Sequence, residues 1–213
     1  MIINEFNIYQ RSLERFVNSL CSNNPIPGGG CVAAMAGVLG QGLVLMVSNF
    51  TTGKEKYSKI QPLVDEAIAL GNSYLDKFKK LSMNDMQYYS DLTYAFRMSK
   101  YEPEDRESAK DVDECLQKCL EVPFEVIEEC EKAMDLLYRI YDKFNMNLIS
   151  DFGVACKMFE SAAYSSYLNV MINEKSLTKD GSLPNTKKAF EMCEKIKKQS
   201  DEVYDFVVKY MMK

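Results

Sequence analysis

A loop rich in glycine and proline, residues 24–30, is the part of this chain best suited to chemistry at a ligand. Its three successive glycines, Gly28, Gly29 and Gly30, leave backbone N–H groups uncovered where a helix is expected to begin. N–H groups at a helix start attract anionic or carbonyl-bearing ligands, because the positive end of the helix dipole lies there. The same glycines can equally form a tight turn that lets two helices approach. The loop alone leaves both functions open.

Two glycine motifs in this region match nucleotide-binding signatures in spacing but not in context. Residues 28–33 have the spacing of a dinucleotide fingerprint, which requires a β-strand directly before it, whereas residues 22–27 contain two prolines and no strand pattern. The pair Gly53-Lys54 matches the end of a Walker loop, yet Ser48 stands where the first glycine belongs and Glu55 where the magnesium-binding Ser or Thr belongs. We therefore expect no nucleotide site.

The chain contains no histidine, which limits the catalytic groups available to it. Histidine-based triads and histidine-bound metals are excluded, so a general acid or base must be Asp, Glu, Lys, Tyr or Cys. The seven cysteines include no Cys-x-x-Cys pair, so we expect no metal site. Cys115 and Cys119 lie one helical turn apart and are expected to be reduced thiols on a helix face. Reduced cysteines indicate a cytoplasmic location.

The length and charge of the chain favour one soluble domain over residues 1–213. A chain of 213 residues can bury a substantial core. Its net charge of −5 and its interspersed Lys and Glu residues provide no basic surface for nucleic acid. The uncharged run over residues 31–52 is interrupted by Gly, Ala, Ser and Asn, so we expect a buried helix there and no membrane span.

Apolar residues recur at steps of three and four along the chain, which predicts helices and no strands. The expected helical segments, by residue number, are 4–21, 29–51, 57–78, 82–98, 103–144, 148–173 and 189–210. Pro123 is expected to kink or restart the fifth segment, and Ser150 or Asp151 to cap the sixth. We therefore predict an all-α fold, a single-domain bundle of about seven helices.

Two of these segments have compositions that can form the walls of a site. The second carries small residues at small-x-x-x-small spacing, such as Ala33 and Gly37, which lets other helices pack at short distance. The sixth carries polar groups between Asp151 and Asn173 at steps of three or four, with small residues between them. A helix face of this kind can line a ligand site.

Several separated blocks of the chain together resemble one family. They are, in order, the loop 24–30 with the small-residue helix after it, Met46-Val47-x-Asn49-x-Thr51, Gly53-Lys54-x-Lys56-Tyr57, Asp85, Ile149-Ser-Asp-x-Gly-Val154 and Leu168-Asn-Val-x-Ile-Asn173. Over nearly the whole chain they resemble the formiminotransferase-cyclodeaminase-like family. That family comprises the cyclodeaminase domain of histidine breakdown and the stand-alone bacterial methenyltetrahydrofolate cyclohydrolases. The chain departs from the family pattern at Cys31, where Ser, Gly or Ala is expected, and at Tyr88-Tyr89, where Ala-Phe is expected.

The resemblance implies an all-helical subunit that acts as a homodimer and holds a folate near the subunit interface. The activity it implies is that of a methenyltetrahydrofolate cyclohydrolase, which hydrolyses 5,10-methenyltetrahydrofolate to 10-formyltetrahydrofolate. The alternatives are a formiminotetrahydrofolate cyclodeaminase, which releases ammonia, and a folate-binding protein without activity. The partner is then a folate, with or without a polyglutamate tail, and no cofactor is required. An uncharged helix agrees with a homodimer, because it needs burial on every side.

Both folate reactions pass through a tetrahedral carbon that bridges N5 and N10, and both need a group that moves protons there. Without histidine a carboxylate is the natural choice, and the resemblance points to Asp85 and Asp151. An acid on a helix is otherwise a solvated surface group, and one at a helix start is a common cap. The candidates for substrate binding are Pro27, Gly28, Gly29, Gly30, Lys54, Lys56, Tyr57, Ser150, Asn169 and Asn173.

Lysine and asparagine side chains among these candidates suit different parts of a folate. Lys54 and Lys56 are cations that can hold a glutamate tail or polarise an oxygen, although lysines on a helix surface are usually solvent-exposed. Asn169 and Asn173 lie one helical turn apart and can pair with the amide edge of the pterin. A buried asparagine bonded to a neighbouring helix is an equally physical explanation for both.

Overall fold

A computed structural model describes residues 6–101, 106–178 and 181–213 of the chain. Within these ranges the chain forms six α-helices and three short 3₁₀ helices, and no strand. The α-helices are α1 (Leu13–Leu20), α2 (Gly29–Asn49), α3 (Gln61–Tyr101), α4 (Arg106–Ile140), α5 (Ile149–Leu177) and α6 (Pro184–Met211). The 3₁₀ helices are η1 (Ile8–Gln10), η2 (Glu55–Ile60) and η3 (Met146–Leu148). The predicted all-α fold is confirmed.

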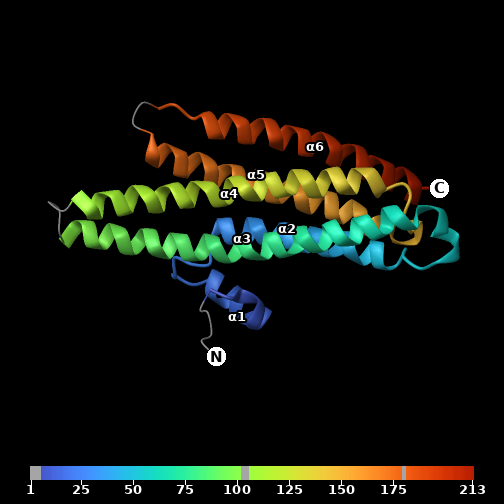
Figure 1. Cartoon of the computed structure of the whole chain (residues 1–213), viewed down its shortest axis with the longest axis horizontal. Helices are drawn as coiled ribbons and strands as arrows, with labels where there is room; N and C mark the ends of the chain where they lie inside the picture. The colour runs from blue at the N-terminus through green and yellow to red at the C-terminus, as the bar shows by residue number, and fades with distance from the viewer. Residues whose placement is uncertain (1–5, 102–105, 179–180) are drawn as a thin grey trace.

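Helices α2 to α6 lie along one long axis, whereas α1 stands apart from them (Figure 1). α2 packs between α3 and α5, and α4 packs against α3, α5 and α6. One large cluster of buried apolar side chains runs through all five long helices. Figure 1 also shows that the hairpin of α3 and α4 extends beyond the other helices at one end. Side chains of this hairpin therefore have fewer neighbours than those in the middle of the bundle.

Glycines on α2 let the neighbouring helices approach closely, as their spacing predicted. A Cβ atom added at Gly37 would lie 2.6 Å from Cδ1 of Phe78 on α3. One added at Gly40 would lie 3.0 Å from Cε1 of Phe159 on α5. Both aromatic rings are fully buried, so they fill the space that a larger residue on α2 would need. The central position predicted for this helix is confirmed.

The apolar composition of α2 is explained by its place in the core. By length and composition this helix is able to cross a membrane, since its most apolar window has a mean hydropathy of 1.9. Half of that window is buried inside the bundle, where α2 packs against α3 and α5. A helix that is apolar on most of its surface is typical of a protein core as well as of a membrane.

The first predicted helix, residues 4–21, is wrong over its first half. Residues 8–10 form a single 3₁₀ turn, and α1 begins only at Leu13, after an extended residue. The side chain of Ser12 accepts a hydrogen bond from the backbone N–H of Arg15 at 3.2 Å. A serine in this position starts a helix rather than continuing one. Residues 4 and 5 lie outside the described ranges.

Two of the predicted segments are one helix, which reduces the predicted seven helices to six in the described residues. α3 continues through the segments 57–78 and 82–98 as a single helix that begins at Gln61, directly after η2. No glycine or proline occurs between residues 72 and 101, so nothing in this stretch interrupts the helix. The predicted helix start at Pro103 lies outside the described residues.

Pro123 does not restart α4, because a neighbouring helix supplies the hydrogen bond that proline cannot make. α4 runs through Pro123 from Arg106 to Ile140. Proline has no N–H group to donate to the carbonyl of Cys119, four residues earlier. Nδ2 of Asn173 on α5 donates to this carbonyl at 2.6 Å. The predicted break at Pro123 is therefore wrong as a restart of the helix.

The capping prediction for α5 is also wrong. α5 begins at Ile149 with Leu148 as its N-cap, and no side chain caps it. Ser150 and Asp151 lie inside the first turn, where an acidic side chain still interacts favourably with the helix dipole. Gly181 has a positive φ of 74°. α6 begins at Pro184, five residues before the predicted start at residue 189, because proline is favourable in the first turn of a helix.

Candidate functional site

A cavity of about 440 Å³ opens where the glycine loop, α3, α4 and the end of α5 meet. Its polar lining consists of Asp85, Asn169, Asn173 and Ser176, together with the loop backbone at residues 28–30. The other lining residues are mainly aromatic or aliphatic: Pro25, Ile26, Tyr88, Tyr89, Leu92, Phe96, Leu116, Cys119, Val122 and Ile172. A mostly apolar cleft with a few polar groups is typical of a site for a small organic ligand.

Asp85 on α3 contacts the first turn of α2 at Gly30 and Cys31. A Cβ atom at position 30 would lie 2.7 Å from Cγ of Asp85, so only glycine leaves room for the carboxylate. The backbone N–H of Cys31 donates a hydrogen bond to this carboxylate. Gly28, the N-cap of α2, has no side chain to serve this purpose. Asp85 therefore caps α2 from a neighbouring helix.

Burial raises the pKa of Asp85 from 3.8 to about 6, and the hydrogen bond from Cys31 only partly opposes this shift. Burial has this effect because it disfavours the charged form of a carboxyl group. A group with a pKa close to the working pH can both accept and return a proton. The role of Asp85 in proton transfer stays a prediction.

Two cysteines near Asp85 are unsuited to act as nucleophiles. Burial raises the pKa of the Cys31 thiol to about 12, and the charge of Asp85 adds to the shift. Burial, and after it the charge of Asp85, also raise the pKa of the Cys119 thiol to about 12. A thiol with such a pKa stays protonated near neutral pH and is a poor nucleophile. Cys115 and Cys119 are free thiols, as predicted.

Asn169 and Asn173 both line the cavity, and each already makes one hydrogen bond. Nδ2 of Asn169 donates to the carbonyl of Ser165 on its own helix at 2.9 Å. Nδ2 of Asn173 donates to the carbonyl of Cys119 on α4, so the alternative of an asparagine bonded to a neighbouring helix holds for Asn173. Gly29 faces Asn169, because a Cβ at position 29 would lie 4.0 Å from the amide of Asn169.

Lys54, Lys56, Tyr57, Ser150 and Asp151, which were also predicted, lie at the opposite end of α2 and α5. Pro27, the other predicted residue, is buried and does not line the cavity. α2 and α5 are antiparallel, because Gly29 faces Asn169 while Gly40 faces Phe159. Asn145, just before α5, donates from its backbone N–H to Thr51 Oγ1 at 3.1 Å, which places the start of α5 beside the end of α2. Eighteen residues of helix, about 27 Å, separate Asp151 from Asn169. One chain therefore does not bring Asp85 and Asp151 into one site.

The two lysines at this second end are exposed and lie over aromatic rings. Nζ of Lys54 is 5.7 Å from the ring centre of Phe50, and Nζ of Lys56 is 5.3 Å from that of Tyr57. Both lysines are exposed, whereas Tyr57 is buried. Such cations remain accessible to an anionic ligand, since an aromatic ring does not neutralise their charge.

A sequence pattern points to some of the residues in the cavity wall, whereas no pattern points to the others. Tyr88, Tyr89 and Phe96 belong to the aromatic segment 82–98, and aromatic residues at helical spacing beside a candidate acid suggest a ligand wall. Leu116 and Val122 on α4 are ordinary apolar helix residues. Only the packing of α4 against α3 and α5 places them beside the ligand space.

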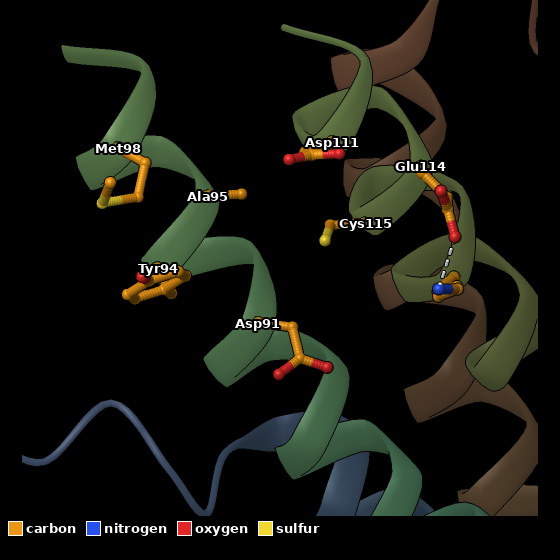
Figure 2. Close-up of a pocket in the computed structure, with 8 residues that line it drawn as sticks. Asp91, Tyr94, Ala95, Met98, Asp111, Glu114 and Cys115 are labelled. Carbon is orange, nitrogen blue, oxygen red and sulfur yellow. Dashed lines mark hydrogen bonds and ion pairs between the residues drawn. The ribbon is translucent and has the colours of Figure 1, made fainter. Parts of the chain in front are cut away.

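A second cavity of about 330 Å³ lies farther along the α3–α4 hairpin (Figure 2). Its charged side chains are Asp91, Asp111, Glu114 and Lys118. Lys118 is engaged in an ion pair with Glu114 at 2.7 Å. Figure 2 shows Asp91 on one helix and Asp111 and Glu114 on the other. This cavity repels an anionic group, because three carboxylates oppose one lysine.

Exposed side chains of α2 and α5 form an apolar surface. On α2 it includes Val32 and Leu39, and on α5 it includes Val154, Leu168 and Ile172, all of them exposed. Leu39 is 57% and Ile172 64% exposed. Exposed apolar side chains grouped on adjacent helices are typical of a protein interface.

The chain matches the family model described as formiminotransferase-cyclodeaminase over residues 12–192. It is 30% identical over 167 residues to the methenyltetrahydrofolate cyclohydrolase of Methylorubrum extorquens, covering 78% of this chain and 80% of that protein. It is 28% identical over 177 residues to the formimidoyltransferase-cyclodeaminase of Mus musculus, covering 83% of this chain but only 33% of that protein.

The fold is similar to a solved structure of formiminotetrahydrofolate cyclodeaminase from Thermotoga maritima. The TM-score is 0.78 and the sequence identity 24%, with 95% of this chain and 96% of the other covered. This likeness confirms the fold of the bundle. Because the family model covers most of the sequence, from α1 into α6, the chain belongs to the formiminotransferase-cyclodeaminase family.

Proposed function

We propose that this protein is a cytoplasmic methenyltetrahydrofolate cyclohydrolase, which hydrolyses 5,10-methenyltetrahydrofolate to 10-formyltetrahydrofolate. The observation that carries the proposal is Asp85, a carboxyl group with a pKa of about 6 in the wall of a cavity rich in aromatic residues. The similarity to a relative that bears the name cyclohydrolase, over 80% of that relative's length, supports the same activity. The free cysteines agree with a reducing compartment.

In the first step a water molecule adds to the methenyl carbon, which is electron-poor because the N5–C–N10 unit is cationic. The Asp85 carboxylate accepts a proton from this water as the carbon–oxygen bond forms. The product of this step is a neutral tetrahedral carbon that carries a hydroxyl group and is still bonded to N5 and N10. Asp85 suits this role because its pKa lies near neutral pH.

In the second step the carbon–N5 bond breaks. Protonated Asp85 returns its proton to N5, the hydroxyl group loses its proton to solvent, and the formyl group remains on N10. The net reaction consumes one water molecule and releases one proton. No electrons are transferred, so the proposed reaction involves no redox cofactor.

The cavity walls are suited to a folate. The flat rings of Tyr89 and Phe96 can pack against the planar parts of the ligand, and the side chain of Asn169 can face the amide edge of the pterin. The acidic second cavity with Asp91 and Asp111 disfavours a glutamate tail. The tail is therefore expected to leave toward the exposed surface of α2 and α5.

We propose a homodimer in which this apolar surface of α2 and α5 is covered by a second copy. A two-fold axis perpendicular to the helices pairs opposite ends of the same surface, because residue i then contacts residue j and j contacts i. In that arrangement the partner subunit's Asp151, Lys54 and Lys56 lie near the cavity that holds Asp85. The lysines can then bind the carboxylates of a glutamate tail.

Formiminotetrahydrofolate cyclodeaminase activity is the second candidate. The observation in its favour is the likeness in fold to a solved cyclodeaminase and in sequence to formimidoyltransferase-cyclodeaminases. This chain spans about a third of the length of those latter proteins. The same proton transfers at Asp85 serve ring closure by N10 followed by loss of ammonia. A folate-binding protein without activity is the third candidate.

Two assays on the purified protein separate these candidates. A cyclohydrolase removes the absorbance of the methenyl group, whereas a cyclodeaminase releases ammonia from 5-formiminotetrahydrofolate. Asp85→Asn is expected to reduce kcat of the active reaction at least about a hundredfold, the range for loss of a general base. Asp76→Asn on the exposed side of α3 is the matched control. Full activity in the double variant of Asp85→Asn and Asp151→Asn would refute both assignments.

A further inference from the structure

The segment before α2 packs against two residues next to Asp85: its chain neighbour Met86 and its hydrogen-bond donor Cys31. Phe6 and Ile8 form a small buried cluster with Cys31 and Met86, separate from the main core of the bundle. Met86 follows Asp85 in the chain, and Cys31 donates the hydrogen bond to the Asp85 carboxylate. The cluster therefore contains the donor to the acid and the residue that follows the acid on α3.

The hydroxyl group of Tyr9 joins the two helices that hold Asp85 in place. It lies 2.7 Å from Oγ of Ser82, one turn before Asp85 on α3, and 3.1 Å from Sδ of Met35, one turn after Cys31 on α2. Tyr9 donates its hydroxyl hydrogen to Met35, and either hydroxyl group can be the donor between Tyr9 and Ser82. Oγ of Ser82 also lies 2.8 Å from the carbonyl of Lys79, to which it can donate. Ser82 is fully buried, and its bond with Tyr9 fixes the segment directly behind the acid.

We propose that Tyr9 is a positioning residue of the active site, because it holds the segment of residues 6–10 as the rear wall that keeps water away from Asp85. This inference rests on the proposed function of Asp85 and adds a part of the chain outside the long-helix bundle to the site. η1 contributes no side chain to the cavity. Its effect on the reaction passes through the burial of Asp85.

The charges of the other groups that face Asp85 do not explain why its pKa is raised. The Cys31 thiol from α2 and the Cys119 thiol from α4 have pKa values of about 12 and are neutral at pH 7. α3 contributes the phenols of Tyr88 and Tyr89, and α5 contributes uncharged amides. Burial is the largest cause of the shift at Asp85, and the segment with Tyr9 is part of that burial.

Three variants test the role of Tyr9 by removing progressively more of its contacts. Tyr9→Phe removes the hydroxyl and keeps the ring, Ser82→Ala removes the hydroxyl that Tyr9 contacts, and Tyr9→Ala removes the ring as well. Each is expected to admit water behind Asp85 and to lower its pKa from about 6 toward the ordinary value of 3.8. The acid limb of kcat/KM should move to lower pH by about one unit in Tyr9→Ala, a tenfold change in the titration constant.

The pairwise and control variants distinguish this role from general loosening of the fold. Tyr9→Phe combined with Ser82→Ala should shift the acid limb no further than Tyr9→Phe alone, because both variants remove the same hydrogen bond, the one between Tyr9 and Ser82. Tyr210→Phe on α6, with a ring of similar exposure, should leave the acid limb unchanged. The helical circular dichroism should stay at the wild-type level in all of them.

A direct titration of the Asp85 carboxyl by ¹³C NMR, without substrate, separates this inference from the proposed function. A lower midpoint in Tyr9→Phe and Ser82→Ala than in wild type supports the role of Tyr9 even if the protein lacks cyclohydrolase activity. An unchanged midpoint in Tyr9→Phe, Ser82→Ala and Tyr9→Ala, with the helical content retained, overturns it.

Discussion

The carboxylate of Asp85 on α3 occupies the space that a side chain at Gly30 on α2 would fill. A Cβ at position 30 would lie 2.7 Å from Cγ of Asp85, and the next N–H, that of Cys31, donates to the same carboxylate. The glycine loop and the acid therefore form one structural unit, although 55 positions separate them in the chain. Gly30 provides the close approach to Asp85, and Gly28 and Gly29 line the cavity beside it.

Gly30→Ala is expected to push the Asp85 carboxylate away from the N–H of Cys31. The folded protein should lose about 1–3 kcal/mol, the usual range for overpacking, and kcat should fall about tenfold or more because the acid is misplaced. Thermal unfolding and the methenyl absorbance assay measure the two effects. Gly42→Ala is the matched control on the same helix, since a Cβ there meets no atom within 4 Å. Equal behaviour of the two variants would contradict the close contact.

Asp85→Asn is expected to stabilise the fold at pH 7 while it removes activity. The folded pKa of Asp85 is raised to about 6 from 3.8, so the wild-type protein loses stability as pH rises from about 4 to 6 and does not regain it above pH 6. The variant lacks this loss and should gain about 1–3 kcal/mol at pH 7. Urea unfolding at pH 7 and at pH 4 measures it, and the gain should vanish at pH 4. A gain of equal size at both pH values would show that titration of Asp85 is not its cause.

Mixed subunits are expected to reveal whether Asp85 and Asp151 act together across a dimer. Subunits with Asp85→Asn and subunits with Asp151→Asn should each be inactive alone. After unfolding and refolding as an equal mixture, half of the dimers contain one subunit of each kind, and each of these has one intact site. About a quarter of the wild-type activity should return. No recovery, with dimers present by sedimentation, would contradict a shared site.

Glu174→Gln is expected to weaken the attachment of α6 to the end of α5. The buried Glu174 carboxylate accepts hydrogen bonds from the backbone N–H groups of Asn185 and Thr186, at 2.8 and 2.7 Å, and from their side chains. Burial raises the pKa of Glu174, but these hydrogen bonds outweigh it and hold the pKa below 4.5. The carboxylate therefore contributes stability above pH 4.5, and this contribution is lost as pH falls through the folded pKa.

The expected cost of Glu174→Gln at pH 7 is about 1–3 kcal/mol, because one oxygen acceptor is replaced by a donor beside buried N–H groups. Chemical denaturation at pH 7 measures the loss. Glu191→Gln on the exposed side of α6 is the control and should change the free energy of unfolding by less than about 0.5 kcal/mol. A similar loss in both variants would contradict the capping role of Glu174.

The sequence was sufficient to predict the all-α fold and the five long helices, apart from their boundaries and the merging of two segments into α3. Spacing of apolar residues at three and four marks α2 to α6 because each buries one face in a common core, and the period of a helix then appears in the chain. Without histidine a carboxylate is the natural group for proton transfer, and Asp85 lies in the wall of the cavity beside the glycine loop. The close-packing role of glycines such as Gly37 also followed from their spacing.

Tertiary structure alone decided which of these residues meet. The antiparallel packing of α2 on α5 places Asp151 and Lys54 at the end opposite Asp85, which no local pattern reveals. The donor that completes α4 at Pro123 comes from Asn173 on another helix, and the capping acid of α2 comes from α3. Such contacts depend on distances between helices, whereas a sequence pattern reports only the surroundings of residues within one helix.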